Sequence, residues 1–145
     1  MDQKYQKLNI ALFSVYGALM LWLLFDRVGG IEGMPYWDQI RANLNLDPFH
    51  TIRLFLKVLG NRAYSTTAVI NLGGNVIMFI PLGFFLPRVF PALRKFRRTL
   101  LITALIITVV ELAQLFTLLG SCDIDDLILN VIGATLGYIL HKLLK

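Results

Sequence analysis

Four long apolar runs divide the chain. They occupy residues 8–25, 67–87, 99–119 and 127–144. A helix rises about 1.5 Å per residue, so about 20 consecutive apolar residues are enough to cross the hydrocarbon layer of a bilayer. The pattern predicts an all-α protein, an integral membrane four-helix bundle that forms a single domain over 1–145.

A shorter stretch, 51–60, lies between the first and second runs and is too short to span a bilayer. Its Arg53 and Lys57 are four residues apart and so share one face of a helix. Tyr36 and Trp37 precede it and suit the headgroup layer. The segment is predicted to be an extra interfacial helix on the outer side; the alternative is a connecting loop that is amphipathic by chance.

Composition supports a membrane protein. Hydrophobic residues make up 57% of the 145 residues, and the mean hydropathy is +0.67, both well above the values of a soluble domain. The net charge of +5 raises the question of nucleic-acid binding. The basic residues lie between the apolar runs instead of along one amphipathic face, so we expect no nucleic-acid partner.

The basic residues also predict an orientation, because Lys and Arg in short loops mark the cytoplasmic side. The connection 120–126 contains none. The ends of the chain and the connection between the second and third runs contain Lys4, Lys7, Arg88, Arg94, Lys95, Arg97, Arg98, Lys142 and Lys145. Both termini are therefore predicted to be cytoplasmic, in a multi-pass protein.

Polar residues interrupt three of the apolar runs in their outer halves. Glu111 is the most costly of them, because a carboxylate held in lipid costs several kcal/mol unless it faces polar partners. The group consists of three pairs spaced three or four residues apart: Glu111 with Gln114, Asn71 with Asn75, and Asp126 with Asn130. The inner halves are almost purely apolar, so the sequence predicts a polar pocket that opens outward. The alternative for the amides is that they only hold helices together.

Three aspartates, Asp123, Asp125 and Asp126, lie within four positions. With Glu111 they are candidates to hold protons, to bind a divalent cation as a metal site, or to pair with Arg53, Arg27 or a cationic ligand. The simpler alternative is that the aspartates cap the last helix at its N-terminus, where negative charge is favourable.

Glycines mark expected helix contacts. Gly133 and Gly137 form a small-xxx-small pattern, which indicates packing between helices and, in some proteins, a homo-oligomer. The pair Gly73–Gly74 is expected to admit another helix closely, and Pro81 to kink the second crossing.

Several motifs together resemble one family. They are Asn71-Leu-Gly-Gly-Asn75-Val-Ile-Met-Phe-Ile-Pro81, Glu111-Leu-Ala-Gln114, Asp123-Ile-Asp125-Asp126-Leu-Ile-Leu-Asn130 with Gly133 and Gly137, and upstream Asn45-Leu-Asp-Pro48-Phe49-His-Thr-Ile52. In this order they are similar to the core of the VanZ-like family of bacterial membrane proteins. Many members carry an arginine shortly before the Asp-x-Asp-Asp segment, whereas residues 120–122 supply none here.

The resemblance implies a four-helix domain in the bacterial cytoplasmic membrane and, for the namesake of the family, a role in resistance to teicoplanin, a glycopeptide with a fatty acyl tail. It does not imply an established reaction.

Three functional hypotheses follow. In the first, the outward pocket binds an amphiphile: a membrane lipid headgroup, a lipid-linked wall precursor or a lipoglycopeptide. The candidate ligand-binding residues are Asn71, Asn75, Glu111, Gln114, Asp123, Asp125, Asp126, Asn130 and Arg53. In the second, the protein is an enzyme that modifies an envelope lipid or precursor, with Glu111 and Asp126 as catalytic residues and a divalent ion on the aspartates. In the third, it is a membrane scaffold for a partner protein.

Overall fold

A computed structural model describes residues 3–26, 29–58 and 65–144, and this part of the chain is all-α, as predicted. Its elements are α1 (Gln3–Phe25), α2 (Tyr36–Ala42), β1 (Leu44–Asn45), α3 (His50–Val58), α4 (Ser65–Val89), the short 3₁₀ helix η1 (Pro91–Leu93), α5 (Phe96–Thr117), β2 (Cys122–Asp123) and α6 (Ile124–Leu143).

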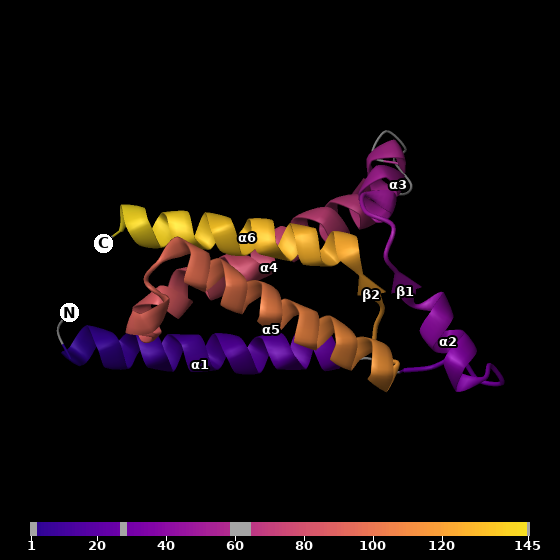
Figure 1. Cartoon of the computed structure of the whole chain (residues 1–145), viewed down its shortest axis with the longest axis horizontal. Helices are drawn as coiled ribbons and strands as arrows, with labels where there is room; N and C mark the ends of the chain where they lie inside the picture. Colours follow the sequence, from indigo (N-terminus) through magenta and orange to yellow (C-terminus); the bar gives the residue numbers. More distant parts are fainter. Residues whose placement is uncertain (1–2, 27–28, 59–64, 145) are drawn as a thin grey trace.

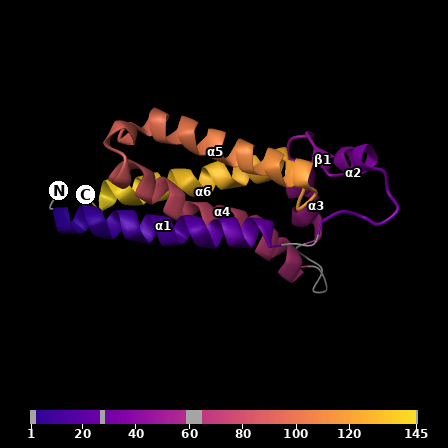
Figure 2. The ribbon, with the colours of Figure 1, turned by 90° about the horizontal axis from the view of Figure 1, so that it is seen from below.

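The four long helices α1, α4, α5 and α6 lie along one another (Figures 1 and 2). Each is long and apolar enough to cross a membrane, as predicted for the four apolar runs. Both termini lie at one end of the bundle, here called the terminal end, and α2, β1 and α3 lie at the other, here called the loop end (Figure 1). Each helix begins two to five residues before its apolar run, because hydropathy marks the lipid-facing length and not the hydrogen-bonded length, whereas α5 and α6 end one or two residues before theirs.

The interfacial helix of the sequence analysis corresponds to α3, which starts at His50 and ends at Val58. None of its residues is buried. The preceding helix, α2, was not predicted, because seven residues are too few to show a periodic pattern. Its Gln39 is buried and bonds the chain just before it: Nε2 donates to the carbonyl oxygens of Met34 at 2.7 Å and Ile31 at 3.2 Å.

The closest helix contact joins α4 and α6. A Cβ atom added to Gly133 would lie 2.0 Å from the carbonyl oxygen of Val76, and one added to Gly137 would lie 1.9 Å from that of Ile80. Gly83 of α4 meets the backbone of α6 in the same way. The small-xxx-small pattern therefore packs two helices of the same chain. A homo-oligomer stays a prediction and requires a surface other than this one.

The Gly73–Gly74 pair behaves differently from the prediction. A Cβ atom added to either residue meets nothing within 4 Å among the described residues, so no helix approaches there and the expected close contact is wrong. Farther along, α4 continues through Pro81 and Pro87 without a break, although each proline removes one helical hydrogen bond.

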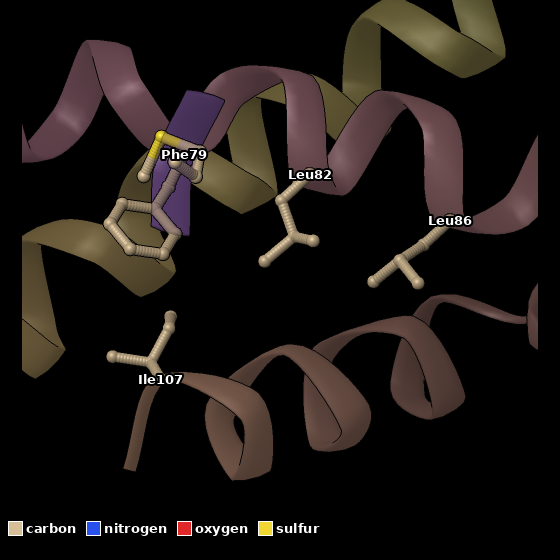
Figure 3. Packing of buried hydrophobic residues seen from close by; sticks show 5 residues of the cluster. Phe79, Leu82, Leu86 and Ile107 are labelled. Atoms are coloured by element: carbon tan, nitrogen blue, oxygen red, sulfur yellow. The ribbon is translucent and has the colours of Figure 1, made fainter. Parts of the chain in front are cut away.

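The apolar core lies between α4 and α5. Phe79, Leu82 and Leu86 of α4 point toward Ile107 of α5, and Met20 of α1 joins them (Figure 3). Met20 is the one buried residue among those of α1. α1 is therefore the most peripheral of the four long helices, and its hydrogen bond from the Tyr16 hydroxyl to the Met78 carbonyl oxygen, 2.9 Å, helps to hold it on α4.

We expect Gly137→Ala to lower the free energy of unfolding by about 1–3 kcal/mol, because the new methyl group would overlap the backbone of α4. The matched control is Gly73→Ala, where the space is open and alanine favours the helix by up to about 1 kcal/mol. Thermal unfolding of the purified protein in detergent measures both. Equal stability of the two variants would contradict the close α4–α6 contact.

Candidate functional site

Residues 29–58 are called the outer segment here, after the orientation predicted for them. The site begins where this segment joins the connection between α5 and α6. Leu44–Asn45 pairs in parallel with Cys122–Asp123, and the Cys122 amide donates to the Asn43 carbonyl oxygen at 2.9 Å. Two strands of two residues stabilise little on their own. The side chains on β2 and at the start of α6 supply the rest of the attachment.

Asp123 uses both carboxylate oxygens. Oδ1 accepts the Asp125 amide at 2.8 Å, which caps the N-terminus of α6 and confirms the capping alternative for this residue. Oδ2 accepts the Thr51 hydroxyl at 2.6 Å and the Asn45 side-chain amide at 3.1 Å. One buried carboxylate thus binds α6 and the outer segment together.

Asp125 is fully buried, with 0% of its surface exposed. Oδ1 accepts the Phe49 amide at 2.5 Å and Oδ2 accepts the Ile52 amide at 3.0 Å. These amides lie at the start of α3, where the first N–H groups have no partner within the helix and negative charge is favourable. Phe49 has a positive φ of 65°, a conformation that costs energy for a non-glycine residue and that these bonds help to hold.

We call these contacts the aspartate latch: Asp123 and Asp125 with Asn45, Phe49, Thr51 and Ile52. Sequence reasoning missed that the two aspartates bind the outer segment. The signal was present, because the Asn45-Leu-Asp-Pro48-Phe49-His-Thr-Ile52 segment contains every residue that the two aspartates contact there.

A second group of polar side chains lies beside the latch, inside the bundle. Glu111 is 7% exposed, and its Oε2 accepts the Asp123 amide at 3.3 Å. The Asn75 side-chain amide donates to Oδ1 of Asp126, which links α4 to α6. Asn130 lies one turn after Asp126 and is 2% exposed, and its Oδ1 makes no hydrogen bond to the described residues. We call Glu111, Asp126, Asn75 and Asn130 the polar group.

Two other candidates lie elsewhere. Gln114 is buried and donates to the carbonyl oxygen of Leu24 at 2.9 Å, so it joins α5 to the end of α1. Asn71 is exposed on α4.

The predicted pairing of Arg53 with the carboxylates is not formed. Its guanidinium donates to the carbonyl oxygens of Phe49 at 2.9 Å and Pro48 at 3.3 Å, and lies 3.9 Å from Asp47. Arg53 therefore braces the exposed side of the α3 start. Arg27 lies outside the described residues.

The three aspartates do not converge on one point. Asp123 and Asp125 bind the outer segment while Asp126 binds Asn75. In residues 3–26, 29–58 and 65–144, no three His, Cys, Asp or Glu side chains gather in a way that could hold a metal ion. The candidate divalent site is therefore not assembled by this geometry.

A hollow of about 220 Å³ lies beside the end of α5, and Gly30, Gln39, Leu118 and Gly120 are among its lining residues. Gly120 lies against the Gln114 side chain, since a Cβ atom on it would be 3.1 Å from Cβ of Gln114. The hollow therefore ends next to a buried side chain of α5, three residues after Glu111.

The pKa of the Cys122 thiol reflects the negative charge of the site. Burial raises the pKa of the thiol, and the negative charges of Glu111, Asp123 and Asp126 raise this pKa further. Carboxylates from α5, β2 and α6 thus act together on one point at the loop end.

We expect Asp125→Asn to loosen the outer segment, because an amide cannot accept both backbone N–H groups. Leaving one buried donor unpaired costs about 1–3 kcal/mol. Amide hydrogen exchange across α3 should speed up accordingly. Asp38→Asn, the same change at an exposed position of α2, should leave the exchange across α3 unchanged; equal exchange in the two variants would contradict the latch.

The thiol pKa gives a pH-dependent test on the only cysteine of the chain. Maleimide reacts with the thiolate, so the midpoint of the rate against pH should lie above that of an ordinary cysteine. Glu111→Gln removes one negative charge and should lower the midpoint, which speeds labelling at a fixed pH below it. Glu32→Gln, at an exposed position, should not move it. An unchanged midpoint in Glu111→Gln would show that the charge of Glu111 does not act on the Cys122 thiol.

Comparison with known proteins agrees with the sequence motifs. The model of the VanZ/LLP1 family matches residues 13–145. Protein VanZ of Enterococcus faecium is 26% identical over 136 residues, which cover 94% of this chain and 74% of that protein. No solved structure matches the chain. The match of the family model spans nearly the whole sequence, and the chain belongs to the VanZ/LLP1 family.

Proposed function

We propose that this membrane protein contributes to glycopeptide resistance of the teicoplanin type, and that its polar group binds the polar head of an amphiphile at the loop end of the bundle. Membership of the VanZ/LLP1 family and the similarity to Protein VanZ support the first part. The second part rests on the chemistry of the polar group.

The observation that carries the proposal is the buried Glu111. A carboxylate inside an apolar bundle is costly, and a second one, Asp126, raises the cost through like charge. Simple helix packing would be served better by apolar side chains of similar volume. The presence of both carboxylates, Glu111 and Asp126, at the loop end favours a role in binding a ligand.

The balance of donors and acceptors indicates what would bind. Glu111, Asp126 and the Asn130 oxygen are acceptors, and the Asn75 amide is the donor that links α4 to α6. Acceptors and negative charge suit a head that offers hydroxyl, amide or amine donors. They repel a phosphate. A lipoglycopeptide therefore fits this end better than a phospholipid headgroup or a wall precursor that is joined to its lipid through phosphate.

The aspartate latch connects the polar group to the outer segment through Asp123. The Asp123 amide donates to Glu111 while the Asp123 carboxylate holds Asn45 and Thr51. A ligand that draws Glu111 away therefore acts on the residue that attaches the outer segment. Binding and the position of α3 would be coupled through one side chain.

The test is a Glu111→Gln variant assayed by teicoplanin susceptibility in a host that the wild-type chain makes resistant. We expect the inhibitory concentration to fall to that of cells with the empty vector, because the amide removes the charge and one acceptor. Glu32→Gln is the matched control, since Glu32 is the only other glutamate of the chain and is exposed. Both variants are compared at equal membrane levels.

Unchanged resistance in Glu111→Gln would refute binding by the polar group while leaving the family role in place. Loss of resistance in both variants would show that the effect does not come from the polar group.

A further inference from the structure

A larger hollow, of about 670 Å³, is lined by the first half of α1 and by the ends of α4 and α6 that lie at the terminal end of the bundle (Figure 1). Leu8 and Leu12 of α1 and Phe85 of α4 form part of an apolar wall. Arg88 and Arg94 are also among the residues that line this hollow. The lining thus combines a long apolar surface with positive charge, which is the pattern of a site for an anionic amphiphile.

Arg88 is held in place by three contacts. Its Nε donates to Nδ1 of His141 at 3.2 Å, and its Nη2 donates to the Leu144 carbonyl oxygen at 3.2 Å. The guanidinium carbon lies 3.9 Å from the centre of the Phe84 ring, a cation–π distance. A planar guanidinium has five N–H donors. The two bonds made to described residues use two of them, so the fixed group can still bind an anion through the others.

The charge around the hollow is of one sign. In the part of the chain that the structure describes, acidic residues occur only in 26–47 and 111–126, at the loop end or in the outer segment. The terminal end carries Lys4, Lys7, Arg88, Arg94, Lys95, Arg97, Arg98 and Lys142. No described carboxylate competes there for the guanidinium groups.

We propose that this hollow binds one anionic phospholipid, with its phosphate on Arg88 and Arg94 and an acyl chain along Leu8, Leu12 and Phe85. Guanidinium groups bind phosphate oxygens through paired, charge-assisted hydrogen bonds. The apolar wall calls for a chain attached to that phosphate, which a free phosphate ion does not have. The basic residues predict that the terminal end faces the cytoplasm, where anionic lipids give the leaflet a negative potential.

The lipid would also complete the packing of α1. This helix has one buried residue, Met20, and the hollow separates its first turns from α4 and α6. A lipid between Leu8 and Phe85 would fill space that no described side chain fills. The site is separate from the polar group, so its occupancy does not depend on the proposed function.

Native mass spectrometry of the purified full chain in detergent tests the proposal, with phosphatidylglycerol and phosphatidylcholine as probes. We expect one phosphatidylglycerol to bind about tenfold more tightly than phosphatidylcholine, and Arg88→Gln to remove this preference. Arg97→Gln is the matched control, because it removes the same charge from an exposed position outside the lining. Inorganic phosphate should not displace the lipid.

Arg88 also contacts α6, so the loss of Arg88 could weaken helix packing as well as lipid binding. A second variant therefore blocks the hollow and leaves Arg88 unchanged. Leu12→Trp places a larger side chain in the hollow, whereas Leu19→Trp makes the same change on α1 outside the lining. We expect only Leu12→Trp to weaken phosphatidylglycerol binding, by about tenfold. Equal binding by all variants, equal binding of the two lipids, or displacement by phosphate would overturn the proposal. Glu111→Gln should bind phosphatidylglycerol normally, which keeps this test distinct from the susceptibility test.

Discussion

The buried carboxylate of Asp125 is the constraint on which the loop end depends. A carboxylate without solvent exposure requires strong donors. The amides of Phe49 and Ile52 supply them. In return, the first turn of α3 gains the negative charge that its exposed N–H groups favour. The outer segment is thus an integral part of the bundle and not a loose connection.

Hydropathy and the charge of short loops were enough to predict the four crossings, because lipid makes a long apolar helix almost the only solution. The cost of burying Glu111 indicated that it needs a polar partner, and the backbone amide of Asp123 is one. The partners of Asp125 are backbone groups more than 70 residues away, so only the motif that contains them, and no side-chain pattern, pointed to the contact. Gly73 and Gly133 look alike in sequence, and only the packed structure shows that α4 and α6 meet at the second.

The two ends of the molecule carry opposite chemistry. The loop end concentrates carboxylates near Cys122, while the terminal end concentrates guanidinium and ammonium groups around an apolar hollow. The same α4 and α6 run through both ends, joined where glycines bring their backbones into contact. By charge alone, a ligand whose polar head is rich in hydrogen-bond donors would bind at the loop end, and a ligand whose head carries phosphate would bind at the terminal end.

The latch also sets the order in which the molecule can assemble during synthesis. Its two aspartates belong to the last quarter of the sequence, whereas the residues they hold lie in the first half. When the ribosome has made the outer segment and even α4, the carboxylates that fix α3 do not yet exist. The outer segment must therefore wait undocked until the start of α6 has been made, so the latch joins the first half of the chain to its last quarter.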